Sequence, residues 1–123
     1  DNYTDSFNPN SVGASNLISA ATLLLNDRER ISFRSSNYFE NVQKYQHVRN
    51  SGPNGINLYS YGIEINSTQP SGSCNMSKIE TIRAKIQTSP LLSTNNLGYF
   101  RSYTQSYNIL RISNGFGALL FDK

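Results

Sequence analysis

The stretch NSTQPSGSCNMSKIE, residues 66–80, lies between two segments with strand-like patterns, and it decides how the chain reverses direction. Pro70 fixes its own φ and biases Gln69 toward extended backbone, whereas Gly72 is free to take a positive φ. We therefore predict a sharp structural turn made of Gln69, Pro70, Ser71 and Gly72. Beyond the turn, Cys74 and Met76 share parity and are predicted to face the core as the next strand begins.

The segments on either side of this turn carry the alternation expected of strands. INLYSYGIEI (56–65) places Tyr and Ile side chains on one face and small or charged ones on the other, which is the period-two pattern of a strand. IETIRAKIQT (79–88) fits both a strand and a helix by periodicity, and its β-branched residues favour the strand. We predict antiparallel strands at both places.

The rest of the chain extends the β-rich pattern. Residues 16–26 are apolar on both parities, as in a strand covered on two faces, and Ser and Asn before Tyr38 predict one short helix over 35–45. Asn114-Gly115 is a turn signal between a Tyr- and Ile-rich segment and FGALLF. Further strands are expected at 29–34, 99–113 and 116–121, with loops at 1–15 and 50–55.

About six short strands with turns between them indicate an all-β, antiparallel sandwich or barrel. The 123 residues suit one domain, with residues 1–15 as a loop or connecting arm. No apolar run reaches the roughly 20 residues that cross a bilayer, and the N-terminus lacks signal-peptide features, so we expect no membrane insertion. The net charge is +3, but its basic residues are scattered, which argues against direct nucleic-acid binding.

Few residues could support catalysis. His47 is the single histidine and Cys74 the single cysteine, so a zinc site of usual ligand spacing and a Ser-His-Asp triad with a spare base are not encoded. We predict no catalytic, metal or cofactor site. A hydrolase built on paired carboxylates, or on Cys74 with His47, stays open as an alternative.

Two surface chemistries are also suggested. Asn2, Asn66 and Asn75 begin N-glycosylation triplets, but an Asn- and Ser-rich chain produces such triplets by chance, and we predict that they are incidental. Tyrosines on a β-sandwich could stack on sugar rings, so a lectin or adhesin is the alternative to a structural protein. The tyrosines concerned are Tyr59, Tyr61, Tyr99, Tyr103 and Tyr107.

Three ordered segments resemble the major capsid proteins of nucleocytoplasmic large DNA viruses. They are QPSGSCNMSKIE (69–80), LNDRERISFRSSNYFENVQKYQHV (25–48) and YNILRISNGFGALLFDK (107–123). The resemblance spans residues 16–123 and implies a partial C-terminal jelly-roll domain, the later strands of the second jelly roll of a double jelly-roll protein. Because a jelly roll needs eight strands, we expect upstream strands of the polypeptide to complete it.

The resemblance also implies a function without catalysis. Such proteins form homotrimers that tile icosahedral capsids as pseudo-hexagonal capsomers, in contact with neighbouring capsomers and minor capsid proteins. The implied location is the virion capsid, assembled in the host cell cytoplasm, and a minor capsid protein would also fit. Aromatic and Arg side chains anchor such interfaces. Candidate interface or packing residues are Arg34, Tyr38, Phe39 and Tyr45, with Phe39 expected in the core.

Overall fold

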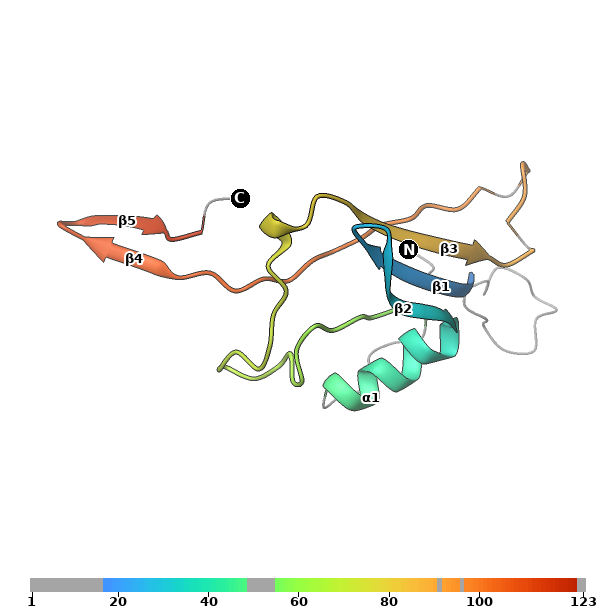
Figure 1. Ribbon diagram of the computed structural model, residues 1–123, viewed down its shortest axis with the longest axis horizontal. Coiled ribbons are helices and arrows are strands. Elements are labelled where there is room, and N and C mark those ends of the chain that lie inside the picture. Colours follow the sequence, from blue (N-terminus) through green and yellow to red (C-terminus); the bar gives the residue numbers. More distant parts are fainter. Residues whose placement is uncertain (1–16, 49–54, 91, 96, 122–123) are drawn as a thin grey trace.

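The computed structural model describes residues 17–48, 55–90, 92–95 and 97–121, and within them the chain forms two antiparallel sheets and one short helix (Figure 1). The elements are β1 (Ile18–Leu25), β2 (Arg28–Ser35), η1 (Tyr38–Val42), α1 (Gln43–His47), η2 (Met76–Lys78), β3 (Ile82–Thr88), β4 (Leu110–Ser113) and β5 (Phe116–Leu119). The prediction of mostly antiparallel β-structure is confirmed, and the jelly-roll arrangement stays a prediction. The 1–15 arm and residues 50–54 of the predicted loop lie outside the described residues.

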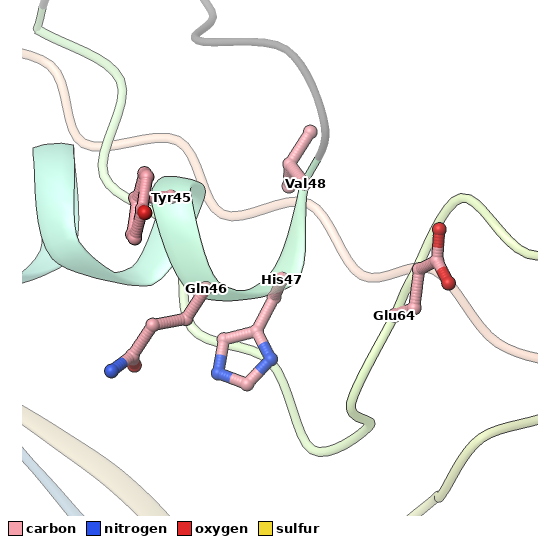
Figure 2. Close-up of a pocket in the computed structure, with 5 residues that line it drawn as sticks. All are labelled: Tyr45, Gln46, His47, Val48 and Glu64. Atoms are coloured by element: carbon pink, nitrogen blue, oxygen red, sulfur yellow. The ribbon is translucent and has the colours of Figure 1, made fainter.

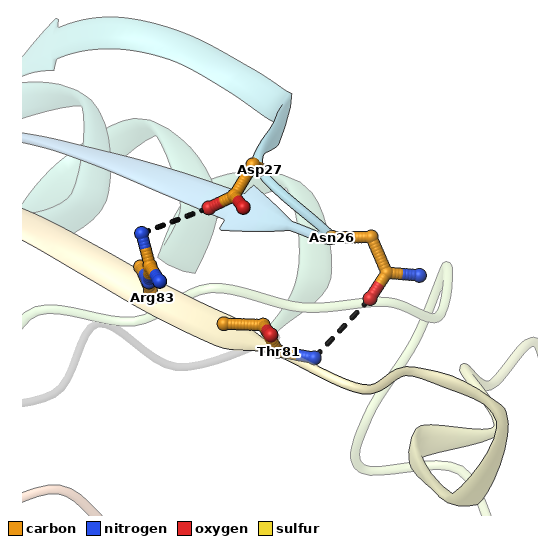
Figure 3. A network of polar contacts seen from close by, with 4 residues as sticks. All are labelled: Asn26, Asp27, Thr81 and Arg83. Carbon is orange, nitrogen blue, oxygen red and sulfur yellow. Dashed lines mark hydrogen bonds and ion pairs between the residues drawn. The ribbon is translucent and has the colours of Figure 1, made fainter.

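The larger sheet has three strands in the order β2-β1-β3, so β1 is central. Its backbone therefore pairs on both edges, whereas the apolar residues of both parities in 16–26 supply side chains to both faces of the sheet. β1 and β2 are joined by Asn26 and Asp27, whose φ angles of 51° and 60° suit the left-handed turns that connect hairpins. Asn26 Oδ1 accepts hydrogen bonds from Thr81 N (Figure 3) and from Glu80 N, which ties this turn to the start of β3.

The two faces of the three-stranded sheet differ in burial. Thr22 and Leu24 alternate on one face of β1 and are 4% and 7% exposed. Thr22 Oγ1 donates to Ile31 O at 2.6 Å, where the β1–β2 register is irregular. On the opposite face, Leu25 pairs with Ile82, which is 47% exposed. That second face is therefore apolar and only partly covered by the described residues.

The helix contains a π-helical turn near its N-terminal end. Gln43 N–H donates to Tyr38 O, five residues earlier, before α-helical bonding resumes. A π-turn shifts the bonding pattern and releases a carbonyl, and here Phe39 O accepts from Leu58 N at 3.0 Å. The irregular turn thus allows a second segment to dock along the helix. Among the described residues, no helix is long and apolar enough to cross a membrane.

The predicted strand at 56–65 is wrong. No strand forms there, because the backbone of this segment bonds to the helix instead of to a neighbouring strand. Ser60 N donates to Gln43 Oε1 and Ile65 N donates to His47 O, in addition to the Leu58 bond. The sequence does alternate, but the hydrogen-bond partners of this segment come from the helix and not from a neighbouring strand.

The predicted strand at 99–113 is right only at its end. Residues 99–109 form no strand, and β4 begins at Leu110 and pairs with β5. Asn108 holds the open end of this hairpin, since its Oδ1 accepts from Phe121 N and its Nδ2 donates to Phe121 O. The hairpin projects away from the rest of the described chain (Figure 1) and contacts none of its other helices or strands.

The core prediction for the segment before β3 is only partly right. Cys74 is half-buried, but Met76 is 37% exposed because it begins the short 3-10 helix η2 rather than a strand. The 79–88 strand prediction is confirmed by β3, which starts at Ile82.

Candidate interaction surface

The helix and the 55–65 segment are joined by a buried polar network. Gln43 is 3% exposed, and its Nε2 donates to the Tyr38 hydroxyl at 2.8 Å while its Oε1 accepts from Ser60 N at 3.2 Å. Glu40 Oε1 accepts from Gly55 N at the start of the segment. Since a buried amide left without partners costs about 1–3 kcal/mol, this network fixes the position of the segment on the helix. Sequence reasoning missed Gln43 because its partners lie 5 and 17 residues away.

Three of the four predicted interface residues lie together. The Arg34 guanidinium stands 5.7 Å from the centre of the Tyr38 ring, which is cation–π geometry, and the Tyr38 and Phe39 rings meet edge to face at 5.2 Å. Phe39 is 7% exposed and so belongs to the core, as expected. Tyr45 is separate from this group and is 91% exposed. Arg34 and Tyr45 thus present polar and aromatic groups to solvent from two different places.

A shallow hollow of about 210 Å³ lies at the end of the helix, lined by Tyr45, Gln46, His47, Val48 and Glu64 (Figure 2). His47 Nδ1 lies 2.8 Å from Ile63 O, and because a carbonyl only accepts, this contact is a hydrogen bond in the tautomer with the proton on Nδ1. Ligand pockets usually enclose roughly 300–1,000 Å³, so this hollow is small for one. Among the described residues, no three His, Cys, Asp or Glu side chains gather in a way that would hold a metal ion.

The segment predicted as a structural turn meets the 62–64 backbone. Ser71 Oγ donates to Glu64 O at 3.0 Å and accepts from Glu64 N at 2.9 Å. Gly72 has φ of +148°, and a Cβ built on Gly62 would lie 2.9 Å from Gly72 O. The two glycines therefore permit a close approach of two backbone segments. Gln69 and Pro70 are exposed beside this contact.

The tyrosines divide into packed and exposed ones. Tyr59 and Tyr61 meet edge to face at 5.0 Å. Burial raises the pKa of the Tyr61 hydroxyl above its usual value, with smaller contributions from Cys74 and Tyr59, and Arg30 opposes them. By contrast, Tyr99 and Tyr103 are 94% and 79% exposed, on the segment that forms no strand. The packed pair therefore has less surface for stacking on a ligand than the exposed pair.

The β4–β5 hairpin presents a second exposed surface. Leu110 pairs with Leu119 and Ile112 with Gly117, so these side chains share one face, and Ile112 is 73% exposed. A two-stranded hairpin is marginally stable alone in water. An apolar hairpin of this kind is suited to packing against further protein.

The glycosylation triplets differ in what the structure describes. Asn2 lies outside the described residues, and Asn66 is exposed. Asn75 is exposed too, and its Oδ1 accepts from Ser77 N at 3.1 Å and from Ser77 Oγ at 2.6 Å, as an N-cap of η2. This local role accounts for Asn75 without a glycan.

The chain is similar over nearly its whole length to capsid proteins. The family model described as the large eukaryotic DNA virus major capsid protein matches residues 2–118. A probable capsid protein 4 of Acanthamoeba polyphaga mimivirus is 40% identical, over 98% of this chain and 24% of the relative. A major capsid protein of Chrysochromulina ericina virus is 39% identical, over 86% of this chain and 18% of the relative. The chain thus spans about a fifth to a quarter of these curated relatives.

Solved structures agree with the sequence comparison. A crystal structure of PBCV-1 VP54, fitted into a reconstruction of the virophage Sputnik, superimposes with a TM-score of 0.68 at 30% identity. The match covers 86% of this chain and 30% of the VP54 chain. A quasi-atomic model of the PBCV-1 virus capsid matches equally well.

Proposed function

The chain belongs to the large eukaryotic DNA virus major capsid protein family, and from this premise we propose that it is a structural subunit, or the C-terminal part of one, in an icosahedral virion shell. The family is one of capsid proteins, which agrees with the prediction of a non-enzymatic chain. Its place is the virion capsid, and its activity is self-association, as a trimer and with neighbouring capsomers and minor capsid proteins. Assembly in the host cytoplasm suits a chain with one cysteine.

The observation that carries this proposal is the apolar surface left uncovered. In the described part of the chain, Leu24 and Phe39 are the buried apolar side chains, while the hairpin β4–β5 and the Ile82 face of the sheet are exposed. Large exposed apolar patches mark protein interfaces. We assign their cover to further jelly-roll strands of the same polypeptide, which would make residues 16–123 the later part of a second jelly roll. The intact mass of the protein in particles tests this directly, and a monomeric, soluble 13.8 kDa species would refute it.

Contacts between subunits are assigned to Arg34 and Tyr45. Both are exposed, and they are the residue types that dominate binding energy at interfaces. Tyr38 supports Arg34 through the cation–π contact, and Phe39 packs in the core. We assign a structural role to the predicted turn residues Gln69–Gly72, because Ser71 Oγ bonds both the N and the O of Glu64 in the helix-docked segment.

The test is assembly of the full-length polypeptide carrying Arg34→Glu or Tyr45→Ala. Each change is expected to weaken association by about 1–2 kcal/mol, because an exposed anchor loses its partner at the interface. Sedimentation velocity over a concentration series measures the trimer, and electron microscopy measures capsomer arrays.

Two control variants match these changes. Lys85→Glu reverses an exposed charge on β3, and Gln46→Ala truncates an exposed side chain next to Tyr45. Both controls should assemble as the wild type does. If Arg34→Glu and Tyr45→Ala also assemble normally, the interface lies elsewhere and this assignment fails.

A second candidate function is glycan binding by a lectin-like surface, favoured by the exposure of Tyr99 and Tyr103. Exposed aromatic rings stack on the apolar faces of sugars. Specific sugar binding on a glycan array that is lost in Tyr99→Ala would support it, while an array without hits would leave the capsid role alone.

A further inference from the structure

The tip of the β4–β5 hairpin consists of Asn114 and Gly115. Ser113 pairs with Phe116, so the connection has only these two residues. Their φ angles are 51° and 78°, both in the left-handed region that two-residue hairpin turns require. Both residues are exposed.

This pair brings together the two groups that react in asparagine deamidation. The carboxamide carbon of Asn114 is the electrophile, and the main-chain nitrogen of Gly115 is the nucleophile. Gly115 has no side chain to obstruct the approach, and even a Cβ built there would meet no atom within 4 Å. The surroundings of the tip therefore leave the reaction path open.

The hairpin also permits the movement that the reaction needs. The turn must rotate to bring the Gly115 nitrogen onto Asn114 Cγ, which breaks the Ser113–Phe116 pair next to it. The hairpin contacts no other helix or strand of the described chain, so within that part of the chain this opening disturbs no other packing. Segments with few packed contacts open locally at low cost. Asn108 bonds to Phe121 at the open end of the hairpin, so the tip can open while the two strands stay joined at that end.

Asn26 provides the contrast within the same molecule. It has the same φ of 51° in a two-residue turn between strands. Its Oδ1, however, accepts hydrogen bonds from Glu80 N and Thr81 N, and the residue after it is Asp27, whose side chain obstructs the approach of the main-chain nitrogen. In the described part of the chain, Asn114 is the asparagine that glycine follows.

We propose that Asn114–Gly115 is a site of spontaneous backbone modification through a succinimide. The Gly115 nitrogen loses its proton and forms a bond to Asn114 Cγ, the Cγ–Nδ2 bond breaks, and the NH2 group takes up a proton and leaves as ammonia. Water then opens the five-membered ring at either carbonyl, which yields aspartate or isoaspartate at position 114. No oxidant or reductant is required.

The two products alter the hairpin differently. Both place a negative charge on a tip that was neutral. Isoaspartate also routes the main chain through the former side chain, which adds a backbone atom to the turn. A two-residue turn sets the register of its strands, so the longer connection disrupts the pairing of β4 with β5. Modification therefore weakens an apolar hairpin that the proposed function requires for packing.

The experiment follows the purified full-length polypeptide during prolonged incubation at mildly alkaline pH. Charge-variant separation should show a single-charge shift to the acidic side, and peptide mapping with isoaspartyl methyltransferase labelling should place it at residue 114. Asn114→Gly is the matched control, because glycine keeps the positive φ while removing the carboxamide. This variant should lose the labelled hairpin peptide.

Mapping separates the alternatives. The sequence contains a second Asn-Gly pair at 54–55, whose asparagine lies outside the described residues. The proposal would be overturned if modification were confined to position 54, or if Asn26 and Asn114 were modified equally. It would also be overturned if Asn114 were modified in the urea-unfolded chain but stayed unchanged in the folded one. None of these outcomes depends on capsid assembly, so the proposed function is tested separately.

Discussion

The Asn26 tether between the β1–β2 turn and β3 should be measurable in Asn26→Ala. Asn26 Oδ1 accepts from Thr81 N at 3.2 Å (Figure 3) and from Glu80 N at 3.0 Å. The site is exposed and water replaces part of each bond, so we take about 0.5 kcal/mol for each, or about 1 kcal/mol together. Alanine at φ of 51° adds about 1 kcal/mol of backbone strain. The free energy of unfolding should fall by about 2 kcal/mol, measured by urea denaturation with circular dichroism.

Asn26→Gly separates the two contributions. It removes the same hydrogen bonds but adopts the positive φ freely, so its loss should be about 1 kcal/mol. Hydrogen exchange of the Glu80 and Thr81 amides should accelerate in both variants. The reasoning is refuted if both variants unfold at the wild-type urea concentration, or if the two amides exchange at unchanged rates.

Two further perturbations test the contact between the two backbone segments and the half-buried Tyr61. Gly62→Ala places a Cβ 2.9 Å from Gly72 O and 3.0 Å from Ser71 Oγ, so overpacking should cost about 1–3 kcal/mol. Gly117→Ala is the control, because nothing lies within 4 Å of a Cβ built there, and it should change the free energy of unfolding by less than about 0.5 kcal/mol. If urea titration gave the same loss of stability for Gly62→Ala and Gly117→Ala, the close contact at Gly62 would be contradicted. Burial raises the folded-state pKa of Tyr61 above the ordinary 10.0, so the folded chain holds this proton more tightly. Stability should therefore fall as pH rises above 10.0 through the folded-state pKa, and thermal unfolding at alkaline pH should show a shallower fall in Tyr61→Phe. An identical slope in both proteins would remove Tyr61 as the cause.

The elements that the sequence predicts well are those whose signals are local. β1, β2 and β3 carry apolar or β-branched runs. Asn114 and Gly115 are the residue types that readily adopt the positive φ angles of a two-residue hairpin turn. The short helix was also predicted, because a polar N-terminal side precedes its apolar residues.

The candidate surface was predicted only in part. Arg34 and Tyr38 were selected as anchor types, and the structure places them in contact. Gln43 and Glu64 were not singled out, because a buried amide or a carboxylate beside a hollow has no sequence signature. Their importance arises from partners that the fold brings together.

The sequence by itself determined local conformation and family membership, since turn residues, β-branched runs and ordered motifs act over a few positions. Only the tertiary structure decided the partner of residues 56–65. Their alternating pattern indicates one covered face, and their backbone needs hydrogen-bond partners. The pattern does not specify whether a strand or a helix provides those partners. The π-turn of the helix releases Phe39 O, and that carbonyl, with Gln43 and His47, bonds a segment that would otherwise have joined a sheet.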